Sequence, residues 1–107
     1  LELDPGEGVE QTISSGAVTV THRVHSVAGE GGSADALTDI EGGQAFDRVR
    51  IYSAGGASAT ITVTHNGSPS ANDLSLTGGA NYDIDTATKF IELEKRLDGV
   101  WYEIRRG

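Results

Sequence analysis

Residues 89–107 read KFIELEKRLDGVWYEIRRG, and they carry the clearest structural signal in the sequence. Asp98-Gly99 favours the two-residue turn of a β-hairpin, because both residue types tolerate the positive φ angles that a type I′ turn requires. That turn predicts the pairs Ile91–Arg106, Glu92–Arg105, Leu93–Ile104, Glu94–Glu103, Lys95–Tyr102, Arg96–Trp101 and Leu97–Val100. One face of the hairpin is then nearly all apolar and the other nearly all charged, so a shift of one residue would destroy the pattern.

The charged face of this hairpin carries features of an interface. It presents Trp101 and Phe90, together with Arg96 and Arg105, and it places Glu94 opposite another glutamate, which calls for a nearby cation. Two large aromatic side chains on one outward face favour a subunit or partner contact. Partial exposure beneath a loop is the alternative. We therefore predict an interface that contains Phe90, Trp101, Arg96 and Arg105.

Composition limits what the chain can be. With 107 residues there is room for one domain, and Leu, Ile, Val and Phe supply only 24 of them. So thin a core favours self-association, which adds buried surface. A net charge of −8 argues against nucleic acid as a partner, and the apolar runs are too short for a membrane span. The absence of cysteine excludes disulfides and thiol chemistry.

The rest of the chain predicts an all-β domain. Residues 1–15 are acidic and rich in turn formers, and we expect an N-terminal arm or linker before a single domain at 16–107. Alternation at 47–53 and 58–65 predicts a second hairpin. About eight short strands, spaced by 8–12 residues and without a helix, indicate an antiparallel β-sandwich or barrel.

Motifs for catalysis or cofactor binding are weak. His22 and His25 would point to opposite faces of a strand, and the glycine-rich residues 29–33 lack the P-loop lysine. The pair Asp83 and Asp85 lacks the remaining ligands of a calcium loop, although a weak surface cation site stays open as an alternative. We predict no enzyme activity, no cofactor and no metal site. The alternatives are a small hydrolase with paired carboxylates and a carbohydrate-binding sandwich that stacks sugars on Trp101 or Tyr52.

Residues 36–106 resemble a domain common in virion proteins of tailed bacteriophages. The resemblance lies in IEGG at 40–43, LTGGANYDID at 76–85, and the closing hairpin with its DGVWYE segment and Arg106. Such domains are homotrimeric β modules of tail fibres, head fibres and capsid decoration proteins. They have no catalytic residues to transfer.

The resemblance implies a virion structural protein assembled in the host cytoplasm. A small chain favours a trimeric capsid decoration (cement) protein that bridges neighbouring subunits of the major capsid protein, with the acidic residues 1–15 reaching along the capsid. The alternative is a tail-fibre or head-fibre module that binds a host receptor or glycan.

Overall fold

The computed structural model describes residues 3–56 and 59–107, so Leu1 and Glu2 of the expected arm lie outside it, as do Ala57 and Ser58. These ranges contain twelve strands and one short 3-10 helix, η1. In chain order they are β1 (Asp4–Glu7), β2 (Gln11–Thr12), β3 (Ala17–Thr19), β4 (His22–Ala28), η1 (Glu30–Gly32), β5 (Asp35–Leu37), β6 (Asp39–Glu41), β7 (Arg48–Ser53), β8 (Ile61–Val63), β9 (Leu74–Ser75), β10 (Tyr82–Ile84), β11 (Phe90–Lys95) and β12 (Trp101–Arg106).

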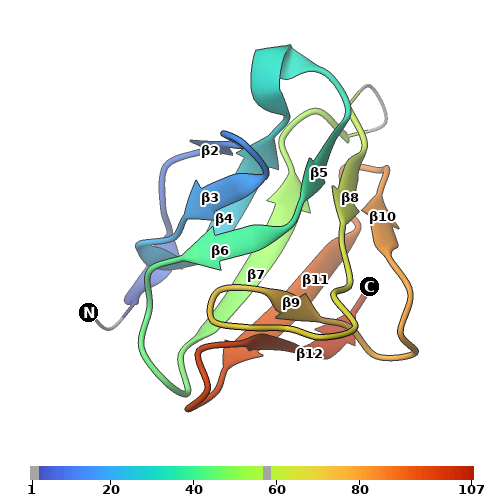
Figure 1. Cartoon of the computed structure of the whole chain (residues 1–107). Coiled ribbons are helices and arrows are strands. Elements are labelled where there is room, and N and C mark those ends of the chain that lie inside the picture. The colour runs from blue at the N-terminus through green and yellow to red at the C-terminus, as the bar shows by residue number, and fades with distance from the viewer. Residues whose placement is uncertain (1–2, 57–58) are drawn as a thin grey trace.

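Three sheets enclose one core (Figure 1). The largest has the order β1-β4-β7-β11-β12-β9, with β2 also paired to β4, and the others are β10-β8-β5 and β3-β6. Strands β3, β4 and β5 form one coil of the chain, and β6, β7 and β8 form the next. Each pairs in parallel with its counterpart, as Ala17 does with Asp39 and Val24 with Arg50. The arrangement is solenoid-like, and the hairpin of β11 and β12 extends the large sheet beyond β7.

The all-β prediction is confirmed, but the prediction of antiparallel sheets is wrong, because the sheets are mixed. Parallel strands usually need a long crossover that contains a helix. Here two parallel neighbours such as β4 and β7 are connected through the strands that lie between them in the chain, β5 and β6, and these make the crossover. Short strands and short loops are therefore compatible with parallel pairing. For the same reason β7 and β8 do not form the predicted second hairpin but lie in different sheets. Ser58, where its second strand was expected to begin, lies outside the described residues.

The core draws on every part of the chain. Its buried members are Leu3, Ile13, Val18, Val20, Val27, Leu37, Ile40, Val49, Ile51, Ile61, Val63, Leu74, Leu76, Ile84, Ile91, Leu93 and Trp101. The segment 1–15, for which we predicted an arm or linker, supplies two of them and also contains β1 and β2, which pair in parallel with β4. In the structure, the described part of this segment therefore lies against the domain.

The terminal hairpin forms, but the predicted register holds only at its open end. Ile91–Arg106 and Glu92–Arg105 pair as predicted, whereas the observed partners nearer the turn are Leu93–Glu103, Glu94–Tyr102 and Lys95–Trp101. The loop is one residue longer than a type I′ turn, because the Arg96 N–H donates to the Val100 carbonyl at 3.0 Å and Gly99 adopts φ +82°. A bulge at Ile104 then restores the predicted register.

This register reverses the expected positions of two residues. Trp101 is fully buried in the core, whereas Leu97 of the predicted apolar face lies in the loop with 83% of its surface exposed. Glu103 also changes face, so it does not oppose Glu94. It lies under the loop at Thr77, whose backbone N–H donates to it at 2.9 Å, and Arg106 binds it through two nitrogens at 2.7 Å. Trp101 therefore cannot contribute to the predicted outward interface.

Candidate interaction surface

The outward face of the large sheet gathers most of the arginines of an acidic protein. Alternation along β7 and β11 turns Arg48, Arg50 and Tyr52 outward beside Phe90, Glu92 and Glu94. Arg105 of β12 joins them opposite Glu92, and Arg96 and Arg23 lie at the margins. We call the set Arg23, Arg48, Arg50, Arg96, Arg105, Glu92 and Glu94 the arginine face. Five guanidinium groups against two carboxylates give it a net positive charge.

Each glutamate of the arginine face lies between two arginines from different parts of the chain. Glu92 accepts hydrogen bonds from Arg50 at 3.2 Å and from Arg105 at 3.0 Å. Its side chain is only 14% exposed. The pair Glu92–Arg105 is one of the two predicted register pairs that the structure retains, and β7 adds the second arginine.

The next glutamate along β11 repeats the arrangement. Glu94 accepts from Arg48 at 3.2 Å and from Arg96 at 2.6 Å, and it too is 14% exposed. Arg96 was predicted to contact Trp101; instead its guanidinium lies 5.4 Å from the ring centroid of Tyr102. Two Arg–Glu–Arg bridges thus link side chains of β7, β11 and β12 across this face.

Both glutamates are held in the charged form. Burial alone would raise the pKa of Glu92, but the hydrogen bonds from Arg105 and Arg50 outweigh it and lower the pKa below its ordinary value. Glu94 behaves in the same way, since burial opposes but does not overcome the hydrogen bonds from Arg48 and Arg96. A general acid or base works best with a pKa near the working pH. The pKa values of both carboxylates are lowered, away from neutral pH, as expected of structural ion pairs.

Aromatic rings close one end of the arginine face. The Phe90 ring lies 4.6 Å from the guanidinium carbon of Arg50 and 5.8 Å from that of Arg105. It also packs at 5.8 Å, in a tilted arrangement, against Tyr52. Of the four residues predicted for an interface, Phe90, Arg96 and Arg105 therefore share this face, and only the buried Trp101 is missing from it.

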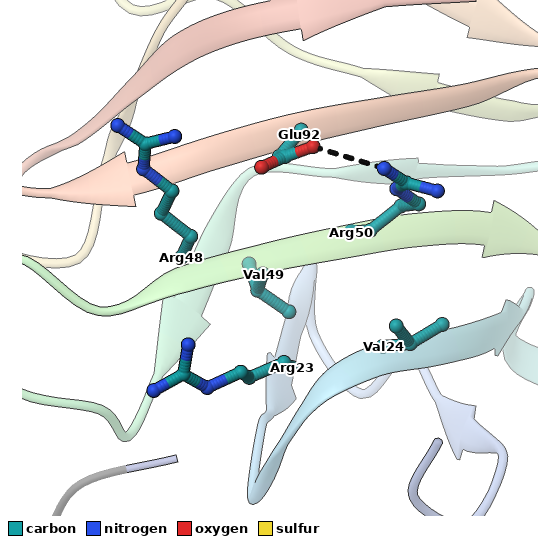
Figure 2. A pocket seen from close by; sticks show the side chains of 6 residues that line it. All are labelled: Arg23, Val24, Arg48, Val49, Arg50 and Glu92. Carbon is teal, nitrogen blue, oxygen red and sulfur yellow. Dashed lines mark hydrogen bonds and ion pairs between the residues drawn. The ribbon is translucent and has the colours of Figure 1, made fainter. Parts of the chain in front are cut away.

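A groove of about 340 Å³ opens between β4 and β7. It is lined by Arg23, Val24, Arg48, Val49, Arg50 and Glu92. Figure 2 shows Arg23 and Arg48 extending on either side of Val49, while Arg50 turns toward Glu92. Within the described ranges Arg23 forms no ion pair, and the Arg48 side chain is 52% exposed. We call this hollow the arginine groove; its exposed apolar surface comes from Val24, since Val49 is fully buried.

A second hollow, of about 450 Å³, lies at the hairpin turn and was not foreseen from sequence. Arg96, Asp98 and Tyr102 line it together with Phe46 and Leu97, two of the three large apolar side chains that the described residues leave exposed. Phe46 adopts φ +74°, a left-handed conformation that is costly for an aromatic residue. Its N–H donates to the Lys95 carbonyl at 2.6 Å and holds that conformation. We call this pair the Phe46–Leu97 patch.

Backbone strain that presents an aromatic ring to solvent is uncommon without a functional reason. The sequence did not predict the strain at Phe46, because no residue near it indicates a positive φ at that position. The arginine face and the Phe46–Leu97 patch are continuous through Arg96, which contributes to both. Together they form the candidate interaction surface.

Neither a family model, nor a curated protein, nor a solved structure matches this chain. None of the helices in the described part of the chain is long and apolar enough to cross a membrane. Across residues 3–56 and 59–107, no group of three or more His, Cys, Asp or Glu side chains is placed to hold a metal ion.

Proposed function

We propose that this protein is a non-enzymatic structural component of a tailed-phage virion, a capsid decoration protein that acts as a homotrimer. Its partner is the major capsid protein, and its place is the outer surface of the virion after assembly in the host cytoplasm. The proposal rests on the resemblance of residues 36–106. It is supported by one structural observation: a strained, exposed Phe46 beside Leu97 at the end of an arginine-rich face whose side chains are joined by ion pairs.

Exposed aromatic side chains and arginines are the groups enriched at the centres of protein interfaces. A surface whose side chains are already fixed loses little conformational entropy on binding, and two Arg–Glu–Arg bridges provide that order here. The paired glutamates are satisfied by arginines, which favours a binding role for this surface over acid–base chemistry.

The alternative is a fibre module that binds a host receptor or glycan. The observation in its favour is the aromatic pair Tyr52 and Phe90 beside Arg50, because aromatic faces and guanidinium groups are suited to sugars that carry a carboxylate. Trp101 cannot serve as the stacking platform, since it is buried. In this form of the proposal Tyr52 and Phe90 bind the sugar.

Binding to undecorated capsids tests the leading proposal. The wild-type protein should co-sediment with capsids, and purified virions should contain it in numbers comparable to the capsid subunits. The double variant Phe46→Gly with Leu97→Ser should bind about tenfold more weakly or worse, the loss expected for interface hot spots. Phe46→Tyr keeps the ring and is the matched control. A handful of copies per virion, or a wild-type protein that does not co-sediment, would contradict the decoration role. Equal binding by all variants would contradict the Phe46–Leu97 patch as the capsid contact.

A further inference from the structure

The described part of the chain exposes little apolar surface for a contact between copies. Three large apolar side chains are exposed there, and two of them, Phe46 and Leu97, form the patch proposed for the capsid contact. The third, Val9, lies in residues 3–13, which we call the N-terminal segment. Copies that dock through their surfaces need an apolar centre at the interface. A contact that reuses side chains already buried within one copy needs no such surface.

The N-terminal segment is an outer layer that precedes the two coils. Its strands β1 and β2 both pair in parallel with β4 at the edge of the large sheet. Leu3 and Ile13, at the two ends of the segment, are buried in the core. The strand pairs that join the two coils, β3–β6, β4–β7 and β5–β8, do not involve it. The segment can therefore leave as a unit without breaking the pairs between the coils.

The place that the segment occupies is shaped for it. The Val9 carbonyl accepts from Nδ1 of the buried His25 at 2.9 Å, and the Leu3 N–H donates to the buried carboxylate of Asp47 at 3.2 Å. The Nε2 atom of His25 accepts from two backbone N–H groups, which assigns the proton to Nδ1. A Cβ on Gly8 would collide with the His25 ring. We call this place, the edge of β4 with His25 and Asp47, the β4 seat; an identical segment from another copy fits it equally well.

A strained two-residue turn joins the segment to β3. Ser14 and Ala17 close the turn with backbone hydrogen bonds of 2.9 and 3.0 Å, and between them Ser15 and Gly16 adopt φ angles of +51° and +84°. Glycine adopts the left-handed conformation freely, whereas serine does so at a cost. The Gly16 carbonyl is fixed to the domain, because it accepts from the Thr38 N–H at 2.8 Å. Ser15 is therefore the pivot at which the chain can extend and release its strain.

We infer that the copies in the proposed homotrimer exchange their N-terminal segments. Each chain extends at Ser15, and its segment fills the β4 seat of the next copy with the hydrogen bonds and buried side chains that it has within one copy. Exchange in one direction around three copies closes a ring. Because the closed and exchanged forms share these contacts, strain in the turn and protein concentration decide between them. This inference rests on the self-association in the proposed function and names the contact that produces it.

Engineered disulfides test the exchange, because the chain contains no cysteine of its own. Thr12 of β2 and Ala28 of β4 are paired neighbours, so Thr12→Cys with Ala28→Cys should form a bridge. This bridge links two copies if the segment is exchanged and closes within one copy if it is not. Thr62→Cys with Asp83→Cys joins β8 to β10, outside the segment, and is the matched control. Oligomers isolated by gel filtration are oxidised and separated on a denaturing gel without reductant.

Substitutions at the pivot give a second measurement and leave the β4 seat intact. Ser15 is exposed, so its replacement changes the turn and no packed contact. Ser15→Gly removes the strain of the closed turn and should weaken association at least about fivefold. Ser15→Val should strengthen association by a similar factor, because a β-branched residue disfavours the left-handed conformation. Sedimentation velocity over a range of concentrations measures both.

The outcomes separate this inference from the proposed function. Covalent dimers and trimers from Thr12→Cys with Ala28→Cys, beside a control that migrates as a monomer, support the exchange. A wild-type oligomer in which the same bridge closes within single copies overturns the exchange and leaves the proposed trimer standing. Association that does not rise from Ser15→Gly through wild type to Ser15→Val overturns it as well. A wild-type chain that stays monomeric at all concentrations overturns both. A free-thiol assay shows that each bridge is complete, and thermal unfolding shows that each variant is folded.

Discussion

The indole Nε1–H of Trp101 donates a hydrogen bond to the Ile40 backbone carbonyl at 3.0 Å and joins β12 to β6 across the core. Both residues are fully buried. Trp101→Phe should therefore lower the free energy of unfolding by about 2–4 kcal/mol, because it leaves a buried carbonyl without its donor and opens a cavity. Leu97→Ala should change it by less than about 0.5 kcal/mol, since that side chain is exposed. Urea unfolding measures both, and equal losses would contradict the observed register.

The backbone conformation that follows β6 requires glycine. Gly42 adopts φ +96°, and a Cβ there would lie 2.4 Å from the Val20 carbonyl oxygen. Gly42→Ala should lower the free energy of unfolding by about 2 kcal/mol or more, from the left-handed conformation and the clash together. Gly67→Ala is the control, because its Cβ would meet nothing within 4 Å and its φ is ordinary. Chemical denaturation of the two variants should show a loss only for Gly42.

The imidazole of His25 holds the N-terminal strands on the domain. His25→Leu removes the donor to Val9 and the acceptor of two N–H groups, so local opening of this segment should become easier by about 2–4 kcal/mol. Hydrogen exchange would report it as faster exchange of the Gly8 amide, which bonds to Val24. His65→Leu breaks a comparable bond at the Leu76 amide, far along the chain, and should leave Gly8 unchanged. Unchanged exchange in His25→Leu would show that other contacts hold the segment.

Acid should weaken the fold through the Arg–Glu–Arg bridges. The pKa of Glu92 is lower in the folded chain than its ordinary value of 4.5, so the folded state binds this proton less readily than the unfolded state. Its stabilising effect is present above pH 4.5 and is lost as the pH falls through the lower, folded-state value. Glu92→Gln should melt below wild type at neutral pH, and the two melting temperatures should converge in acid. Arg105→Gln removes one of the two arginine partners and should give an intermediate pH profile. Parallel curves for wild type and Glu92→Gln would contradict this view.

Local sequence signals predicted local structure. Turn chemistry and alternation predicted the existence of the terminal hairpin, the position of its loop around Asp98-Gly99 and its two outer pairs, whereas the predicted two-residue turn was wrong. The inner register was not, because two one-residue irregularities offset each other: the longer loop shifts the strands by one, and the bulge at Ile104 shifts them back. Neither leaves a signature in residue type, and their combined effect moved Trp101 from the predicted surface into the core.

The parallel coils and the second hollow required three-dimensional information. Alternation predicts strands but not their partners, and the pairing of Val24 with Arg50 joins residues 26 apart in the sequence. The Glu92–Arg105 pair was predicted, whereas Arg50 joins it only because β7 lies against β11. Positive φ at Phe46 depends on its hydrogen bond to Lys95, a contact with a residue distant in the sequence.

The coiled arrangement also governs how quickly the chain reaches its native state. Ile91 pairs with Ile51, 40 residues away, and Asp35 pairs with Ile61, 26 residues away. Most sheet contacts therefore require the closure of a long loop, and the entropy of that closure is lost before the contacts stabilise the fold. Chains with such distant partners fold in roughly milliseconds to seconds, and exposed strand edges persist in the meantime. Synthesis from the N-terminus delivers β1 to β8 first, and their large sheet gains its last neighbours only when the closing hairpin emerges from the ribosome.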